Sequence, residues 1–562
     1  MQTTESKTND LNERAKQLAM AKVHSIESTQ TSPVGYRSAG RLLIVGSTEQ
    51  AVPLAKQLQK HLQCTVVQIQ DSKADSISID NSSGKLRVVT VPGIEIDGYL
   101  GSFTVISTKP DEQHNLAQVL GEQDGVFDLV LDLETPPSIS RDVLPPGYYA
   151  PGDNKDNLNT ILQELPGLVG EFEKPKYFQY NPDICAHGAS GINGCTRCID
   201  ACPTEAIVSL GEKVEVNPYL CQGGGSCATV CPSGAMTFVY PPLSETLNNV
   251  RTLARHYRES GGREPVLLFH DAMAGRHILE PVHEKIPGNI IPMEIEEIGA
   301  VGIEVWLAAM AYGINKTVLL IPPLTSGRVQ QAIHQQMIYA SAVIEGVGYS
   351  PEYISTISAT DSDSLMDQLN SMQVEADIHP ATFSPEYDKR TTLRLAMDHL
   401  YRHAPSQVKT APLPSGAPFG EIAVEKEACT LCLACVSVCP TSALADGQDI
   451  PQLRFDEWNC VQCGLCEKAC PEDAITRNAR FVYDPEIRRR TRILNEDVPF
   501  CCVVCGKPFA TNAVMQTISA RLKNHYMFQT PESKRRLQMC EDCRVRDMFK
   551  QEKDDSTPRR SL

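Results

Sequence analysis

The stretches CTLCLACVSVCP (residues 429–440) and CVQCGLCEKACP (residues 460–471) decide the fold of the region around them. Both have the spacing C-x2-C-x2-C-x3-C-P, in which cysteine thiolates ligate two [4Fe–4S] clusters within one small domain. Three closely spaced thiolates wrap three corners of one cube, and the fourth leaves toward the neighbouring cube while proline fixes φ as the chain departs. The spacing therefore predicts a domain with two clusters over residues 421–485.

Ligation across the pair assigns four cysteines to each cluster, because the last cysteine of each motif serves the other cube. A zinc site needs only four thiolates and has no use for two interleaved sets that each end in Cys-Pro. The pattern is that of a bacterial ferredoxin with two clusters. The predicted ligands are Cys429, Cys432, Cys435 and Cys470 for cluster 3, and Cys439, Cys460, Cys463 and Cys466 for cluster 4.

The same pattern recurs earlier in the chain, in altered form. CTRCIDACP (residues 195–203) supplies the last three cysteines of one motif, and Cys185 precedes it behind the Gly-rich loop AHGASGING. We expect this loop to bring Cys185 to the corner that Ile192 leaves vacant. Residues 175–242 are therefore predicted to form a second ferredoxin-like domain with two clusters. The expected ligands of cluster 1 are Cys185, Cys195, Cys198 and Cys231.

The partner motif, CQGGGSC (residues 221–227), has Gly224 where the second cysteine is expected. Cluster 2 then keeps three thiolates, from Cys202, Cys221 and Cys227. Three interpretations compete: a [3Fe–4S] cluster, a [4Fe–4S] cluster whose open iron is bound by water, His187 or a partner's side chain, and loss of the cluster. The first is the simplest, and the last is disfavoured because three thiols and Pro203 remain. A solvated histidine is the commoner role for His187 in a polar loop.

The C-terminal cysteines follow a different pattern. CCVVCGKPF (residues 501–509) and MCEDC (residues 539–543) contain two C-x2-C pairs, and none of these cysteines precedes a proline. Four thiolates, with a glycine that permits the tight turn beneath the metal, predict a structural zinc site. Residues 486–562 are therefore expected to form a basic, zinc-ribbon-like tail. The predicted zinc ligands are Cys502, Cys505, Cys540 and Cys543, and Cys501 is left spare.

The remaining segments contain almost no cysteine, and Cys64 is expected to be a core thiol. Alternating apolar strands and helices predict α/β domains at residues 39–165 and 245–395. The Pro-rich run TAPLPSGAPFG at 410–420 predicts a linker. Residues 1–38 are polar without clear periodicity and are predicted to be a mobile tail. The fold class is therefore a multidomain combination of α+β and α/β parts.

Composition limits the function. Asp and Glu outnumber Lys and Arg by 69 to 52, which disfavours nucleic acid and anionic lipid as partners. The basic run RRRTR (488–492) is interpreted as a solvated face, with docking onto an acidic partner or nucleic acid as the alternatives. The N-terminus lacks a basic start followed by an apolar run, and no stretch of about 18 apolar residues occurs. Twenty-one cysteines spaced for metals indicate a reducing compartment, so we expect a cytoplasmic protein without a membrane span.

The order of these parts resembles a known family. HGASGINGCTRCIDACPTEAI (187–207), the paired cysteine blocks and the tail CGKPF…MCEDC are similar to multi-cluster 4Fe–4S proteins encoded beside bacterial formate dehydrogenases. Residues 264–325 are similar to the small iron–sulfur subunit of methyl-viologen-reducing hydrogenase, but HDAMAGRH (270–277) lacks its cluster-binding cysteines. The resemblance implies a redox partner: a molybdenum or tungsten formate dehydrogenase or a related oxidoreductase.

Two functions from different classes follow. Four clusters on a chain without a flavin or NAD fingerprint indicate an electron carrier that serves a partner oxidoreductase. The alternative is a non-redox accessory or maturation factor for a molybdenum or tungsten enzyme. A weaker third is an enzyme that uses an open iron at Gly224, which needs nearby arginines, and Arg197 is the one candidate. The predicted cofactors are three [4Fe–4S] clusters, one [3Fe–4S] or open-site [4Fe–4S] cluster, and one Zn²⁺ ion.

Overall fold

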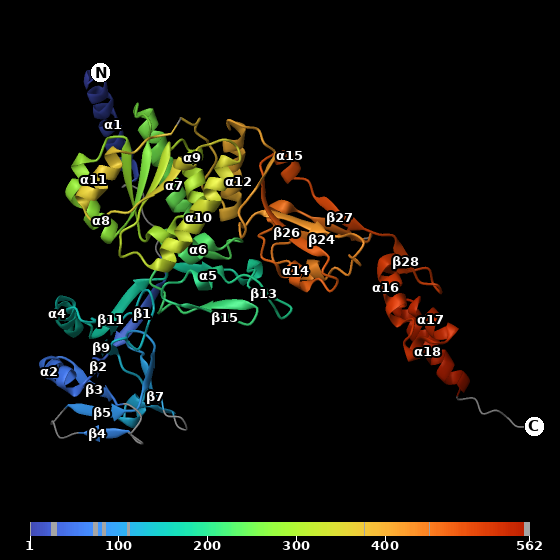
Figure 1. Cartoon of the computed structure of the whole chain (residues 1–562), viewed down its shortest axis with the longest axis horizontal. Helices are drawn as coiled ribbons and strands as arrows, with labels where there is room; N and C mark the ends of the chain where they lie inside the picture. The colour runs from blue at the N-terminus through green and yellow to red at the C-terminus, as the bar shows by residue number, and fades with distance from the viewer. Residues whose placement is uncertain are drawn as a thin grey trace, which may run out of the picture.

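The computed structural model describes residues 2–23, 31–70, 77–80, 86–108, 113–375, 377–448 and 450–555. These residues form two α/β domains, two small cysteine-rich domains and a helical C-terminal tail (Figure 1). The first cysteine-rich domain lies between the two α/β domains, and the second lies beside it (Figure 1). The tail extends away from this body. Among the helices described, none combines the length and the apolar character that crossing a bilayer requires.

The first α/β domain is built on a six-stranded sheet. In spatial order its strands are β10 (Tyr148–Tyr149), β9 (Leu129–Asp132), β2 (Arg41–Val45), β3 (Gln63–Ile69), β5 (Arg87–Val91) and β4 (Ser78–Asp80). All neighbours are parallel except β4 and β5. Four consecutive residues of β2 are buried, as expected for a parallel strand covered on both faces.

Each face of this sheet has its own core. The helices α2 (Thr48–Leu58) and α4 (Lys155–Glu164) cover one face, where Cys64 lies buried as expected. The other face is covered by α3 (Leu116–Val119) and the antiparallel sheet of β6 (Ile94–Asp97), β7 (Thr104–Thr108) and β8 (Gln113–Asn115). Outside the predicted boundaries, β1 (Pro33–Ser38) pairs with β11 (Gly170–Pro175) and closes the domain.

The prediction of a mobile tail over residues 1–38 is wrong where the structure describes that segment. Helix α1 (Gln2–Val23) packs on α7 (Leu243–Glu259), and Ala15 and Ala19 are fully buried at the contact. Two small side chains four residues apart let helices approach closely, but they give only a weak amphipathic pattern. Residues 1 and 24–30 of the predicted tail lie outside the described residues.

The second α/β domain has a four-stranded parallel sheet with strands in the order β19 (Ile290–Ile295), β18 (Val266–Asp271), β20 (Lys316–Leu320) and β21 (Ile354–Ile357). One face packs on α7, α9 (Ile303–Ala311), α10 (Gly327–Glu345) and α12 (Lys389–Arg402). The other packs on α8 (Ala274–Leu279) and α11 (Ser362–Asn370). The predicted boundary at residue 395 falls inside α12, because the buried face of that helix continues to Leu400.

The two cysteine-rich domains share one plan. In the first, β12 (Phe178–Tyr180) pairs with β17 (Met236–Phe238), and β15 (Ile207–Leu210) pairs with β16 (Lys213–Val216). In the second, β23 (Gly420–Val424) pairs with β26 (Ile475–Val482), and β24 (Leu444–Asp446) pairs with β25 (Gln452–Phe455). Each domain adds two short helices, α5 (Arg197–Asp200) and α6 (Ser226–Val230) in the first, and α13 (Ala434–Ser437) and α14 (Leu465–Ala469) in the second. In each, the outer strands pair and the inner strands form a hairpin.

The predicted linker at 410–420 is also wrong. Strand β22 (Thr410–Pro412) pairs with β26, and Ala417 and Phe419 are buried in the core of the second α/β domain. Proline is compatible with an edge strand, because a strand at the edge leaves one row of N–H groups unpaired. The Pro-rich composition therefore marks an edge and not a flexible connection.

The second cysteine-rich domain extends beyond its predicted end at residue 485. Strand β27 (Arg492–Glu496) pairs antiparallel with β25. Arg488, interpreted as part of a solvated face, is buried, pairs with Asp398 and lies 5.0 Å over the Trp458 ring. The tail proper begins at β28 (Pro499–Cys501) and β29 (Pro508–Thr511), and continues through α16 (Asn512–Leu522), α17 (Pro531–Leu537) and α18 (Glu541–Asp555).

Candidate metal centres

Three of the cysteine loops, 221–227, 429–435 and 460–466, have the same backbone conformation. Each places its third and fifth residues at positive φ, which is uncommon for residues other than glycine. The repetition shows that the three loops turn in the same way around the position that the thiols face. The residues are Gly223 (φ 80°) and Gly225 (72°), Leu431 (54°) and Leu433 (60°), and Gln462 (55°) and Gly464 (84°).

A second repeated feature follows each Cys-Pro pair. The third residue after each of these cysteines has positive φ: Glu205 (53°), Gly234 (76°), Ser442 (52°) and Asp473 (50°). This turn directs backbone N–H groups at thiol sulfurs. The donors are the N–H of Ala206 to Cys202 Sγ at 3.3 Å, of Met236 to Cys231 Sγ at 3.4 Å, and of Ala474 to Cys470 Sγ at 3.3 Å. Such hydrogen bonds stabilise thiolates and tune iron–sulfur clusters.

The structure brings together the four thiols predicted for cluster 1. Burial raises the pKa of the Cys198 thiol. The thiolate charges that raise it further are those of Cys231, Cys195 and Cys185. Cys185, which directly follows the short helix η2 (Pro182–Ile184), therefore lies near enough to Cys198 for its charge to act on that thiol.

The thiols predicted for clusters 3 and 4 are grouped in the same way. Burial raises the pKa of Cys435 to about 12, and the charges that add to this shift are those of Cys429, Cys432 and Cys470. A hollow in the same domain is lined by all four cluster 4 thiols, Cys439, Cys460, Cys463 and Cys466. Both arrangements fit a cubic cluster, since several thiols converge on one site.

The loop with Gly224 surrounds a similar hollow. It is lined by Gly224 and by the three cluster 2 thiols, and its solvent-sized volume is about 30 Å³, against about 20 Å³ in the hollow at cluster 4. The absence of a fourth thiol has therefore not caused the site to collapse. Removal from water raises the pKa of the half-buried Cys227, and the charges of Cys221 and Cys202 add to the shift.

Gly224 differs from its two glycine neighbours. A Cβ at Gly223 would meet the Tyr177 ring at 2.8 Å, and one at Gly225 would meet Ala300 Cα at 2.5 Å. At Gly224 a Cβ would contact only the Pro203 ring, at 3.3 Å, and φ is not positive. Tyr177 and Ala300 therefore leave room only for glycine on both sides of this position, whereas a side chain can be accommodated at Gly224.

The side chains proposed to complete or assist cluster 2 lie elsewhere. His187 is neither solvated nor free to bind iron, because it is buried with Nδ1 2.9 Å from the Cys195 carbonyl and Nε2 2.7 Å from Ser209 Oγ. Arg197 donates to the carbonyl of Gly416 at 2.7 Å. Among the described residues that line the hollow, none is a histidine or a carboxylate.

Two cations lie close to the cluster 2 thiols instead. Lys174 Nζ donates to the Cys221 carbonyl at 2.7 Å, and Arg328 Nη1 donates to the Cys202 carbonyl at 2.9 Å. Burial lowers the pKa of Lys174 to about 8, against a smaller raising effect of the Cys221 charge. These positive groups favour the accumulation of thiolate charge at a site that has only three thiols.

One thiol of cluster 1 and one of cluster 4 lie near the contact between the two cysteine-rich domains. Burial raises the pKa of Cys195, and the charge of Cys463 in the other domain adds to it. Next to Cys195, a Cβ at Gly194 would meet Leu465 Cγ at 2.9 Å, so the Leu465 side chain packs on the Gly194 backbone. Lys468 Nζ donates to a backbone carbonyl of the first domain at 2.7 Å.

The four tail cysteines form a compact group. The sulfur atoms of Cys502, Cys505, Cys540 and Cys543 all lie within 4.8 Å of one another. Burial alone would raise the pKa of the Cys502 thiol. Hydrogen bonds from backbone N–H groups, of which that of Cys540 has the largest effect, lower this pKa to about 6. Cys501 is exposed and outside this group, as expected. Four thiolates at this separation suit tetrahedral zinc or iron.

Comparison with known families agrees with this geometry. The family model of the 4Fe-4S dicluster domain matches residues 192–235 and again residues 428–474. No curated protein matches the chain. The two segments are therefore ferredoxin-type dicluster domains, and the chain is an iron–sulfur protein with several clusters. No disulfide links any of the 21 cysteines, all of which lie within the described residues.

One group of possible metal ligands was missed from the sequence. Ring nitrogens of His379, His399 and His403 lie within 4.8 Å of one another, and His399 Nε2 is 2.5 Å from the His379 carbonyl. The spacing of His399, in the last turn of α12, and His403, the residue that follows the helix, was the available signal. His379 could not be foreseen, because only the tertiary structure places it beside that helix.

Proposed function

We propose that this protein transfers electrons between redox partners, with its two dicluster domains holding four iron–sulfur clusters in one row. The observation that carries the proposal is the packing of Leu465 on Gly194 across the domain contact, which brings the charge of Cys463 near Cys195. Bound clusters would supply one-electron transfer, and the role of the protein is to fix the distances between the thiol sites and to exclude water from them.

The order of the row follows from neighbouring thiols. Beyond the effect of burial, the charge of Cys198 of cluster 1 raises the pKa of Cys227 of cluster 2, and the charge of Cys435 of cluster 3 raises that of Cys466 of cluster 4. Together with the domain contact of Gly194 and Leu465, which lies beside Cys195 and Cys463, this gives the order 2, 1, 4, 3. We assign each cluster the cysteines predicted from the spacing.

The two ends of the row differ in access. Cys432 of cluster 3 is exposed. The loop 221–227 is packed against the second α/β domain, since Cβ atoms at Gly225 and Gly299 would clash with Ala300 and with the Gly224 carbonyl. We therefore propose that the protein partner docks near Cys432, and that cluster 2 is an internal end. With three thiols and no histidine or carboxylate among its described lining residues, cluster 2 is proposed to be [3Fe–4S] or an open-site [4Fe–4S].

The proposed partner is a formate dehydrogenase or a related molybdenum or tungsten oxidoreductase, and the proposed compartment is the cytoplasm. The support for the partner is the resemblance of residues 187–207 and of the CGKPF…MCEDC tail to proteins encoded beside such enzymes. The proposed tail metal is zinc, because its cysteines lack the Cys-Pro pairs of the dicluster domains. The alternative function is a non-redox accessory factor for the same class of enzyme.

The domain contact can be tested directly. Gly194→Leu should separate the domains, since even its Cβ would meet Leu465 Cγ of the second domain at 2.9 Å, and Lys468→Ala removes the adjoining hydrogen bond. Gly191→Ala is the matched control, because it lies in the same hairpin at positive φ with nothing within 4 Å. In the fully reduced protein, electron paramagnetic resonance should show magnetic coupling between the domains that weakens in both test variants and persists in the control.

A spectroelectrochemical titration separates the two functions. Reversible reduction and reoxidation of every cluster in the purified protein is expected for an electron carrier. Clusters that cannot be reduced without being destroyed would support the accessory role. Coupling that is unchanged in Gly194→Leu and Lys468→Ala would show that electrons do not cross at this contact.

A further inference from the structure

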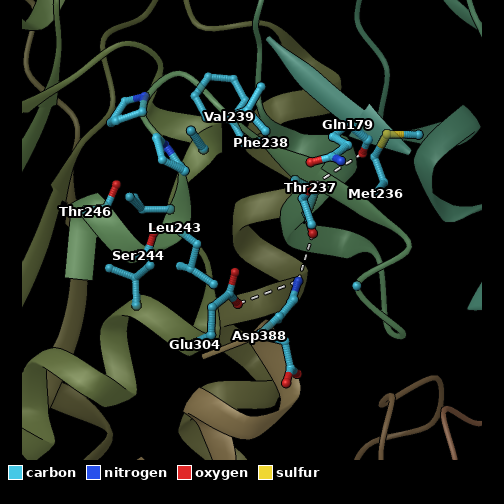
Figure 2. Close-up of a pocket in the computed structure, with 18 of the residues that line it drawn as sticks. Gln179, Met236, Thr237, Phe238, Val239, Leu243, Ser244, Thr246, Glu304 and Asp388 are labelled. Carbon is cyan, nitrogen blue, oxygen red and sulfur yellow. Dashed lines mark hydrogen bonds and ion pairs between the residues drawn. The ribbon is translucent and has the colours of Figure 1, made fainter. Parts of the chain in front are cut away.

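A large cavity lies between the first dicluster domain and the second α/β domain (Figure 2). Its solvent-sized volume is about 630 Å³, within the range of sites for small organic molecules. Strand β17 and its flanks line one side, and α7, α9 and the start of α12 line the other. The cavity plays no part in binding the clusters, yet both domains contribute to it.

The cavity is next to the cluster 1 thiols. Its lining residue Ser233 has Oγ 3.7 Å from Cys231 Sγ, and the N–H of the lining residue Met236 donates to the same sulfur at 3.4 Å. Ile184, which also lines the cavity, directly precedes Cys185. A molecule in this cavity would therefore be separated from the cluster 1 site by a single layer of residues.

One buried carboxylate in the wall is incompletely bonded. Glu304 is 4 % exposed, and its Oε2 has no hydrogen-bond partner. The nearest cation is Lys389, whose Nζ forms an ion pair with Oε2 at 3.6 Å and donates hydrogen bonds to the carbonyls of Ala228, at 2.8 Å, and Thr229. A buried carboxylate with an oxygen that receives no hydrogen bond favours a ligand that donates one.

The remaining charges select the ligand further. The other ionisable lining residues, Glu296, Glu386 and Asp388, are all acidic. Lys389 is the one basic residue among the described lining residues, and it is already bonded. The site therefore disfavours carboxylates and phosphates, since it offers them no free cation. Its apolar walls include Phe238, Leu243, Val301 and Val305, which suit a flat hydrocarbon ring.

We propose that this cavity binds an aromatic molecule, uncharged or cationic, whose N–H or O–H group donates to the Glu304 carboxylate. Binding follows from the cavity alone. A role for such a molecule as an electron donor or acceptor beside Cys231 rests on the proposed function of the chain.

The test measures binding and not turnover. The probe is the fluorescent cation 9-aminoacridine, and its matched counterpart is acridine-9-carboxylate, which has the same ring system but a negative charge. Equilibrium dialysis against the full-length protein with its clusters should show one saturable site for the cation and none for the anion. Glu304→Gln removes the anionic acceptor and should weaken binding about tenfold, as expected for a hydrogen bond to a charged group.

Two further variants keep the result interpretable. Leu243→Trp should abolish binding by filling the cavity while leaving every charge in place. Glu345→Gln, which removes an exposed carboxylate at the end of α10, should leave binding unchanged and thus excludes general attraction to an acidic protein. Equal binding of both probes, or a cation affinity unaffected by Glu304→Gln and Leu243→Trp, would overturn the proposal. Reversible redox cycling of the clusters would be unaffected by either outcome, so the two proposals fail separately.

Discussion

The loops 221–227 and 460–466 have the same backbone but different numbers of thiols. Both place the third and fifth residues at positive φ, and both surround a hollow of similar size. Only the second has a cysteine, Cys463, at the central position; the first has Gly224. The shape of the loop therefore does not depend on the full ligand set.

The difference lies in what surrounds each loop. The loop 221–227 is covered by the second α/β domain through Ala300, whereas Cys463 of the loop 460–466 lies at the contact with the other dicluster domain. Each loop packs within an apolar core that includes its cysteines. Packing against neighbouring residues can therefore hold a metal-binding loop in shape when one ligand is missing.

The largest expected effect is in the tail, where such packing is absent. Its buried cluster consists of Cys502, Met539, Cys540 and Cys543 against Phe509 among the described residues. Because small metal domains gain about 10 kcal/mol of folding free energy from zinc, Cys540→Ser should unfold the tail after residue 499. Circular dichroism and zinc analysis measure the loss, while the iron content should stay unchanged. A tail that stays folded without zinc would show that packing holds it in shape, as it does the dicluster loops.

A smaller effect is expected from adding one methyl group to equivalent glycines. Gly225→Ala places its Cβ 2.5 Å from Ala300 Cα, at positive φ, and should destabilise the first dicluster domain by about 3 kcal/mol. At Gly464 the Cβ would meet only the Arg477 guanidinium, at 3.0 Å, and Gly464→Ala should cost about 1 kcal/mol. The temperature at which visible absorption is lost reports both. Equal losses would show that the second α/β domain does not support the loop.

Exchanging the central residues should exchange the two sites. Gly224→Cys supplies a fourth thiol where only the Pro203 ring must shift slightly, and the iron content should rise by about one atom per chain if cluster 2 is [3Fe–4S]. The paramagnetic signal of an oxidised [3Fe–4S] cluster should disappear in the same variant. Gly224→Ala is the control, since it adds the Cβ without sulfur. Cys463→Gly should lower the iron content.

Unchanged spectra in Gly224→Cys would mean that no cluster forms at the first loop. A wild-type protein with no oxidised signal, but with the iron content of four complete cubes, would instead indicate an open-site [4Fe–4S] cluster with a ligand other than cysteine.

The smallest effect concerns the segment that covers the loop 221–227. Burial, with the charges of Asp271 and Glu296, raises the pKa of Glu297 to about 7, and Glu297 precedes the short helix η4 (Ile298–Ala300) that covers Gly225. Because the pKa of Glu297 is higher in the folded than in the unfolded protein, the free energy of unfolding is highest at a pH below the pKa of the unfolded state. It falls as the pH rises through 7, where Glu297 of the folded protein ionises. Glu297→Gln should therefore stabilise the protein by about 1 kcal/mol at pH 8 and hardly at pH 4. Thermal unfolding at the two pH values measures this, and equal gains would contradict it.

The sequence by itself determined the dicluster domains. Ligand spacing is local, since three thiolates within seven residues can reach one cube only by a particular turn, and the repeated Cys-Pro pairs identify both domains and the altered position at Gly224. The alternation of apolar strands and helices determined the class of the two α/β domains in the same local way.

Only the tertiary structure decided what lies between these parts. The burial of α1, the edge strand β22 and the internal position of Arg488 depend on partners far away in sequence or on surfaces that no periodicity records. The effect of the Cys463 charge on Cys195 and the Glu304 oxygen that receives no hydrogen bond have the same origin. Such features arise from domain packing, because burial removes water from polar groups whose partners the local sequence does not specify.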